Sequence, residues 1–226
     1  MVNASRPRGQ TPLLPSYVLV DGSALFLAVR ALSDGRALDY RALMDVLCEN
    51  VPGLTRPGGR DDETQWVMWT SASIDNAGQN RFLEFAEKEL LWTVRRVAPA
   101  ESFMVDPAAA LGITQDSRAS SRLVRFDASI AFATARVADT HRVVVVSDSF
   151  PLADPLQRAC RFRGTGVASN VLAFFGRAVD GRWQRLLRDP TKHGIQFVDL
   201  DEFEARLFGG GKEVSRSASD EDRHPF

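Results

Sequence analysis

The sequence predicts a three-layer α/β/α sandwich around a central, mainly parallel β-sheet. Two apolar runs, Tyr17–Val20 and Val143–Val146, lack the polar alternation of a half-exposed strand and are typical of strands buried on both faces. Predicted strands and helices also alternate along the chain. This rhythm favours right-handed βαβ crossovers and a parallel sheet that is covered by helices on both sides.

The composition is that of an ordinary soluble globular protein. The 226 residues suffice for one sizeable α/β domain, and 44% of them are hydrophobic and 25% charged. The net charge of -1 gives no overall attraction to nucleic acid, so such binding would need a local basic patch. No apolar run approaches the ~20 residues of a membrane span, and the N-terminus lacks the apolar core of a signal peptide. We therefore expect a cytoplasmic protein without a membrane partner, with Cys48 and Cys160 as small core residues.

The domain is expected to span residues 16–208, between disordered ends at 1–15 and 209–226 that are rich in Pro, Gly, Ser and charge. The first strand ends at Asp21, and Ser23 is expected to cap the next helix. The apolar face predicted for that helix consists of Leu25, Phe26, Val29 and Leu32. The following predicted elements are a helix over 39–49, a strand over 65–70, a helix over 77–94 and a strand over 101–105. Residues 106–122 are the best candidate for a mobile loop.

The second half of the chain repeats the alternation of helix and strand. Asp127 opens a helix over 128–137, the strand 143–146 follows, and Pro151 starts a helix that runs to about residue 160. The remaining predicted elements are a strand over 166–172, a helix over 180–189, a strand over 195–200 and a helix over 202–208. The four tryptophans lie in predicted strands or on helix faces, so we expect them in the core: Trp66, Trp69, Trp92 and Trp183.

Three acids stand out by their position. Asp21 and Asp148 each follow an apolar strand, and Asp127 begins the helix that leads into the strand of Asp148. The carboxyl ends of parallel strands meet at one edge of a sheet, where ligands bind. Carboxylates held close together repel one another, and a hard cation such as Mg²⁺ or Mn²⁺ relieves the repulsion. Such a metal can activate water, so the pattern predicts phosphodiester hydrolysis.

Purely structural roles remain open for some of these acids. Asp is a preferred helix-capping residue, so Asp127 can simply cap its helix. Asp148 or Ser149 can likewise cap the helix announced by Pro151. Asp154 falls in a first helical turn, where the helix dipole favours an acid in any case. Asp21 is harder to explain as a cap, since Ser23 already supplies one.

Three segments resemble the NYN branch of the PIN-like nuclease domains: Val18–Ser23, Arg125–Asp127 and Val146–Leu152. The resemblance extends over about residues 17–200 and is sharp at these three places. It implies an α/β/α sandwich in which Asp21, Asp127 and Asp148 bind Mg²⁺ or Mn²⁺ as catalytic metal ligands. It also implies cleavage of RNA, by a metal-bound water that attacks the phosphodiester.

The chain departs from the family pattern at several positions. Ala24 replaces the usual Asn, the helix after Asp127 lacks a second acid, and Ser149-Phe150 follow Asp148 where the family has a further Asp. Three acids can hold one metal but make a two-metal site unfavourable. The alternative is a catalytically weakened module that binds RNA or a protein partner. A phosphatase is less attractive, because Asp21-Gly22-Ser23 lacks the second Asp of an aspartyl-phosphate enzyme and no P-loop is present.

RNA is the expected partner, and a homo-oligomer or a protein partner stays open. The predicted substrate contacts are Ser23, Ser147, Arg122 and Arg125, the two serines touching the metal's water shell or a phosphate oxygen. Arg158, Arg161 and Arg163 follow the third motif and extend a local basic rim.

Overall fold

A single parallel β-sheet organises the protein. The computed structural model describes residues 14–58, 64–71, 77–97, 126–161, 170–188 and 194–209. Its six strands are β1 (Ser16–Asp21), β2 (Thr64–Ser71), β3 (Thr93–Val97), β4 (Arg142–Val146), β5 (Asn170–Phe174) and β6 (Ile195–Asp199). They lie in the order β3-β2-β1-β4-β5-β6, and every neighbouring pair is parallel. The predicted parallel sheet is confirmed.

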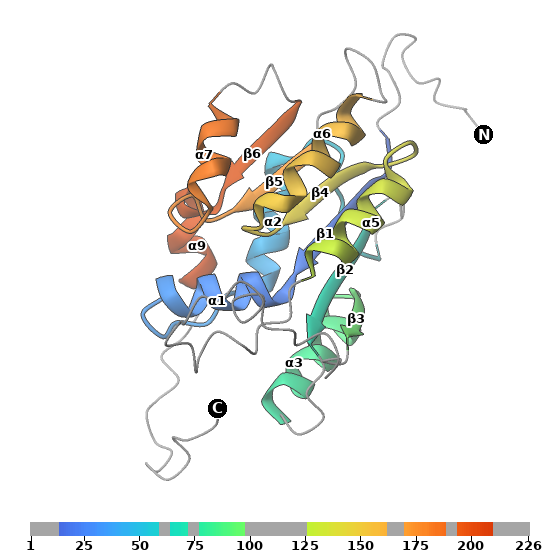
Figure 1. Cartoon of the computed structure of the whole chain (residues 1–226). Helices are drawn as coiled ribbons and strands as arrows, with labels where there is room; N and C mark the ends of the chain where they lie inside the picture. Colours follow the sequence, from blue (N-terminus) through green and yellow to red (C-terminus); the bar gives the residue numbers. More distant parts are fainter. Residues whose placement is uncertain are drawn as a thin grey trace, which may run out of the picture.

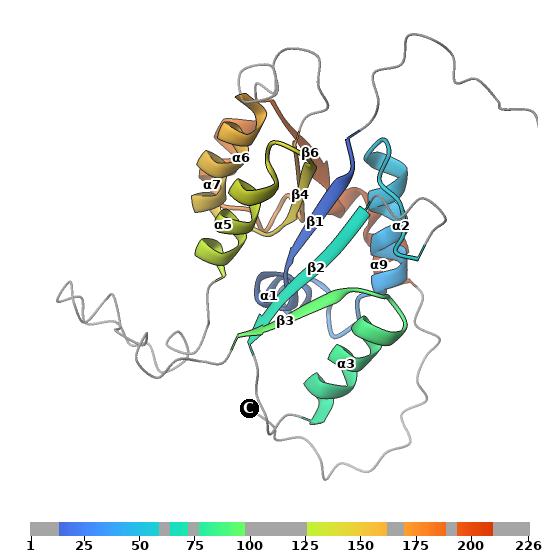
Figure 2. The same cartoon turned by 90° about the vertical axis from the view of Figure 1, so that its right-hand side faces the viewer.

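Helices cover both faces of the sheet, which confirms the three-layer prediction (Figures 1 and 2). One face carries α5 (Asp127–Val137), α6 (Ala153–Arg161) and α7 (Gly181–Leu187), and the other carries α2 (Tyr40–Asn50), α3 (Ala77–Lys88) and α9 (Glu204–Phe208). Helix α1 (Gly22–Leu32) starts where β1 ends, and short 3₁₀ turns occupy Phe150–Leu152 (η2) and Leu200–Phe203 (η3). The helices change face because the chain steps outward from β1 to β3 and then crosses over to β4.

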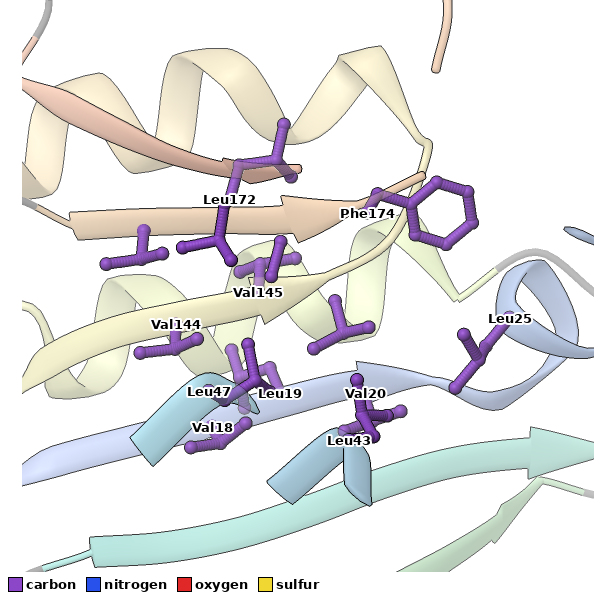
Figure 3. Packing of buried hydrophobic residues seen from close by; sticks show 14 of the residues in the cluster. Val18, Leu19, Val20, Leu25, Leu43, Leu47, Val144, Val145, Leu172 and Phe174 are labelled. Carbon is purple, nitrogen blue, oxygen red and sulfur yellow. The ribbon is translucent and has the colours of Figure 1, made fainter. Parts of the chain in front are cut away.

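The central strands form the core. All five residues of β4 are buried, as the run of valines predicts. Figure 3 shows Val18, Leu19 and Val20 of β1 beside Leu43 and Leu47 of α2, with Val144 and Val145 of β4 on the neighbouring strand. Burying each such side chain contributes about 1.5–3 kcal/mol. The four tryptophans are buried as predicted, and the rings of Trp66 and Trp92 stack with centroids 5.5 Å apart.

The expected helix over 77–94 is wrong at its end. Helix α3 stops at Lys88, Leu91 has a positive φ of 55°, and Thr93–Val97 form the edge strand β3. An edge strand is half exposed, so β3 carries Arg95 and Arg96 and lacks the apolar run of a central strand. The strand expected over 101–105 and the loop over 106–122 lie outside the described residues.

Other boundaries shift by a few residues. Strand β5 covers 170–174 where 166–172 was expected, and Asn170 fixes its start by accepting from the Val143 amide and donating to the Leu156 carbonyl. Phe26 does not join the apolar face of α1, because it is 52% exposed while Leu25 and Ala28 are buried. The expected disordered ends fall almost wholly outside the described ranges. None of the helices in those ranges combines the length and apolarity needed to cross a bilayer.

Candidate functional site

The carboxyl edge between β1 and β4 is the topological switch point of the sheet. The chain proceeds from β1 toward β3 on one side and from β4 toward β6 on the other. Val20 pairs with Val146, so Asp21 and Ser147 follow side by side at this edge. Ligands of open α/β sheets bind in the crevice beyond such a point. We therefore take Asp21 and the segment 147–149 as the centre of the candidate site.

Asp21 is a buried acid, the residue being only 4% exposed. Its Oδ1 accepts hydrogen bonds from the amides of Ser23 at 3.1 Å and Ala24 at 2.9 Å, so Asp21 is the N-cap of α1. The prediction that Ser23 caps this helix is wrong, because the helix begins directly after the strand and leaves Asp21 in the capping position. The other oxygen, Oδ2, accepts from the Ser147 hydroxyl at 3.4 Å.

The turn between β1 and α1 packs closely against β2, and its amides are occupied by Asp21. A Cβ added at Gly22 would lie 2.8 Å from the Trp69 carbonyl oxygen, so α1 starts in close contact with β2. The amides of Ser23 and Ala24, which would otherwise bind an anion, already serve the Asp21 carboxylate. A negative charge therefore occupies the place where a dinucleotide-binding fold receives its pyrophosphate. The Asp21 carboxylate repels a second anion at this position.

Ser147 and Ser149 line the same edge with buried hydroxyls. The Ser149 amide donates to the Ser147 Oγ at 3.2 Å. The Ser149 Oγ is buried and has no hydrogen-bond partner within the described part of the chain. Ser149 does occupy the N-cap position of η2, but its side chain makes no capping bond there. A buried hydroxyl without a partner is unusual in a folded protein and fits a ligand or water at this edge.

The course of the backbone places the other two predicted acids, Asp148 and Asp127, at the same edge of the sheet. Asp148 is half-buried and lies one residue beyond Ser147, the position alongside Asp21. Asp127 is the first residue of α5, whose N-cap is Phe126, so Asp127 does not hold the capping position. Since α5 precedes β4 and runs antiparallel to it, α5 begins at the carboxyl edge. The side chain of Asp127 lies outside the described residues, as do Arg122 and Arg125.

The remaining predicted residues are placed as follows. Asp154, a possible substitute for the missing family acid, is exposed and forms an ion pair with Arg158 at 2.8 Å. Arg163 and the side chain of Arg161 lie outside the described residues. Ser23 is half-buried and touches Asp21 through its backbone amide. Burial raises the pKa of the Cys48 thiol to about 11, so this cysteine is not a nucleophile at neutral pH.

The donor atoms of the site suit a hard cation. They are the oxygens of the Asp21 carboxylate and of the Ser147 and Ser149 hydroxyls, with Asp148 between the two serines in the chain, and oxygen ligands are those that Mg²⁺ and Mn²⁺ prefer. Among the side chains that the structure describes, no three His, Cys, Asp or Glu residues gather into a metal site. Asp127 is not among those side chains, so a three-acid site depends on its carboxylate.

A second group at the same edge escaped prediction from the sequence. The guanidinium of Arg182, in the first turn of α7, lies over the ring of Phe150 with its Cζ 4.7 Å from the centroid. Phe150 in turn packs edge-on against Trp183 at 5.4 Å. The guanidinium is held in its plane by Asp180, which accepts from the Nε at 3.0 Å and from the Nη2 at 2.7 Å. Phe150 and Arg182 lie far apart in the sequence, so no local pattern joins them.

The comparisons with known proteins bear on the fold alone. No protein-family model matches the chain, and a search of curated proteins finds no match either. A solved structure of a protein of unknown function from Vibrio parahaemolyticus RIMD 2210633 is similar, with a TM-score of 0.53 and 13% sequence identity. The match covers 85% of this chain and 98% of that one. The sandwich architecture therefore occurs in a second protein of about the same extent.

Proposed function

We propose that the protein is a metal-dependent endoribonuclease that hydrolyses RNA phosphodiesters. The observation that carries the proposal is the buried Asp21 carboxylate at the switch point. Asp148 comes directly after Ser147, the residue that lies alongside Asp21 on the neighbouring strand. Carboxylate oxygens are ligands that Mg²⁺ and Mn²⁺ prefer, and the Oδ2 of Asp21 faces Ser147 at this edge. The sequence resemblance to NYN-type nucleases supports the same chemistry.

The residues have distinct roles in this proposal. Asp21, Asp148 and Asp127 would hold Mg²⁺ or Mn²⁺, which supplies an activated water and a polarised phosphate when bound. The amides of α1 fix the Asp21 carboxylate from one side, and the Ser147 hydroxyl contacts it from the other. Ser23, Arg122 and Arg125 are the proposed contacts to the RNA backbone.

Neutralising the two acids tests the proposal. We expect the double variant Asp21→Asn, Asp148→Asn to lose Mn²⁺-dependent RNA cleavage at least about 100-fold, since a carboxylate ligand becomes a neutral amide. Asn is as good an N-cap as Asp, so α1 should remain folded. The matched control is Asp139→Asn, an exposed acid in the turn before β4, at the opposite edge of the sheet. Cleavage by the purified double variant at the wild-type rate would refute the proposal.

The alternative is a catalytically weakened module that binds RNA or a protein partner. A specific observation favours it: among the side chains that the structure describes, no three His, Cys, Asp or Glu residues gather into a metal site. Calorimetric titration with Mn²⁺ separates the two functions. A nuclease should bind Mn²⁺ at or below millimolar concentration and lose that binding in the double variant, whereas the module should show no binding.

A further inference from the structure

We propose that Arg182 and Phe150 form a stacking platform for a base of single-stranded RNA, beside the acidic site. The inference rests on the proposed function and names how that site takes its substrate. Base stacking on aromatic rings and on arginine planes is the usual way in which proteins hold unpaired RNA bases.

The geometry fixes the guanidinium as a flat surface. Its Cζ lies over the Phe150 ring, 4.7 Å from the centroid. Asp180 holds its edge through the Nε and Nη2 bonds and also accepts from the Arg182 backbone amide at 2.8 Å. The Arg182 side chain is still 53% exposed, so it remains accessible to a ligand. A planar cation with one face already on an aromatic ring is preorganised to stack on another ring.

The charge of Arg182 is already matched, which argues against a phosphate contact. The hydrogen bond from Arg182 lowers the pKa of Asp180 to about 2, so the pair stays ionised throughout the neutral and mildly acidic range. With Asp180 beside it, the guanidinium offers little net positive charge to a phosphate. The planar surface of the guanidinium is therefore the feature that would contact a ligand.

The platform lies within reach of the acids. Phe150 comes three residues after Ser147, whose hydroxyl contacts Asp21. At ~3.6 Å per residue at most, the two backbones are within about 11 Å of one another. A short single strand can span a distance of this order, so the platform is proposed to take one base while a neighbouring phosphate lies at the acids.

A comparison of base-bearing and abasic strands tests the platform. Fluorescence anisotropy would measure binding of a short oligoadenylate RNA and of an abasic strand of the same length, with Asp21→Asn in every protein to prevent cleavage. Arg182→Lys keeps the charge and loses the plane. We expect it to weaken oligoadenylate binding by about five- to 100-fold, the range of one lost base stack, and to leave abasic binding unchanged. Phe150→Leu should act in the same direction, and Arg188→Lys, at the far end of α7, is the control that should change neither.

Each other outcome overturns the platform. Equal weakening of both strands by Arg182→Lys would make Arg182 a phosphate contact, and unchanged binding of oligoadenylate would remove Arg182 from the RNA site. If either of these results were found while RNA cleavage still required Asp21 and Asp148, the platform would be refuted and the proposed function would stand. A wild-type protein that neither bound nor cleaved RNA would instead refute the proposed function, and the platform with it.

Discussion

At the scale of single residues, substitution by alanine should affect the free energy of unfolding differently at two buried serines, Ser147 and Ser149. Ser147→Ala removes the acceptor of the Ser149 amide and a donor to Asp21, and leaving a buried donor unpaired costs about 1–3 kcal/mol. Ser149→Ala removes a buried hydroxyl that has no partner in the described structure, so the free energy of unfolding should stay level or rise. Urea denaturation of both variants measures the difference. Equal destabilisation by the two substitutions would contradict these hydrogen-bond assignments.

The same residues show what the sequence can predict of the site. The positions of Asp21 and Asp148 follow from local patterns, because Asp21 comes directly after an apolar run and Asp148 comes one residue beyond another. The contact between Asp21 and Ser147 does not, since it depends on the register of two strands that lie far apart in the chain. The choice between Asp21 and Ser23 as the cap also fails from sequence alone, because both residue types cap helices well and the answer depends on where β1 ends.

At the scale of elements, aspartates start several of the helices and turns. Asp39 caps α2 by accepting from the amides of Arg41 and Ala42, in the same way that Asp21 caps α1. Asp180 and Asp199 do the same at α7 and η3. The capping role of Asp21 is therefore ordinary in this protein, and its burial at the switch point is what distinguishes it.

This repetition gives a test of what the cap at Asp21 contributes. Asp39→Ala should lower the free energy of unfolding by about 1 kcal/mol, because two amides of α2 lose their acceptor, and Asp39→Asn should restore most of it. Asp21→Asn should be equally well tolerated while RNA cleavage falls. Thermal or urea unfolding checks all three variants. Destabilisation by Asp21→Asn well beyond that of Asp39→Asn would show that the charge of Asp21 is structural.

Elements that lack a strong periodic signal were the ones mispredicted. The central strands are buried on both faces and appear in the sequence as unbroken apolar runs, whereas β3 at the edge contains two exposed arginines. Trp92, which adds apolar bulk to the expected helix, instead lies after α3 and packs against Trp66 on β2. Its burial comes from this tertiary contact, which no local pattern contains.

At the scale of the whole molecule, the alternation of helices and strands along the chain predicts the three layers of the fold but not the order of the strands in the sheet. Helix and strand periodicity suffice for a parallel sheet between two layers of helices. Which strand lies beside β1 depends on long-range packing, and it decides whether Asp21 and the segment after β4 meet. The second half of the chain must cross to the far side of β1 for a switch point to exist. The proposed stacking platform depends instead on the pairing of β4 with β5, because it joins residues that follow these two neighbouring strands.

The end of the fold is attached to its first half by a charged pair. Arg206 of α9 donates to both carboxylate oxygens of Glu49 on α2, at 2.6 and 2.7 Å. Nearby, the Asp39 amide donates to the Leu207 carbonyl at 2.9 Å. These contacts hold α9 against α2, and the two helices lie side by side in Figure 2. In the chain, α2 follows α1, the helix that Asp21 caps.

The pair should make stability depend on pH in a defined direction. The hydrogen bond from Arg206 lowers the pKa of Glu49 from its ordinary 4.5, so folding is favoured by the ionised form. That stabilisation is fully present above pH 4.5 and is lost as the pH falls through the lowered pKa. Glu49→Gln should therefore lower the Tm slightly at pH 7 and in low salt, and the difference from wild type should vanish in acid. Glu84→Gln, which breaks an exposed pair within α3, is the control and should change the Tm less. Because Glu49→Gln loosens α9, it should also speed hydrogen exchange at the Asp39 amide, and unchanged exchange there would show that the other contacts of α9, among them the Glu204 ion pairs with Arg36 and Arg177, hold the helix without Glu49.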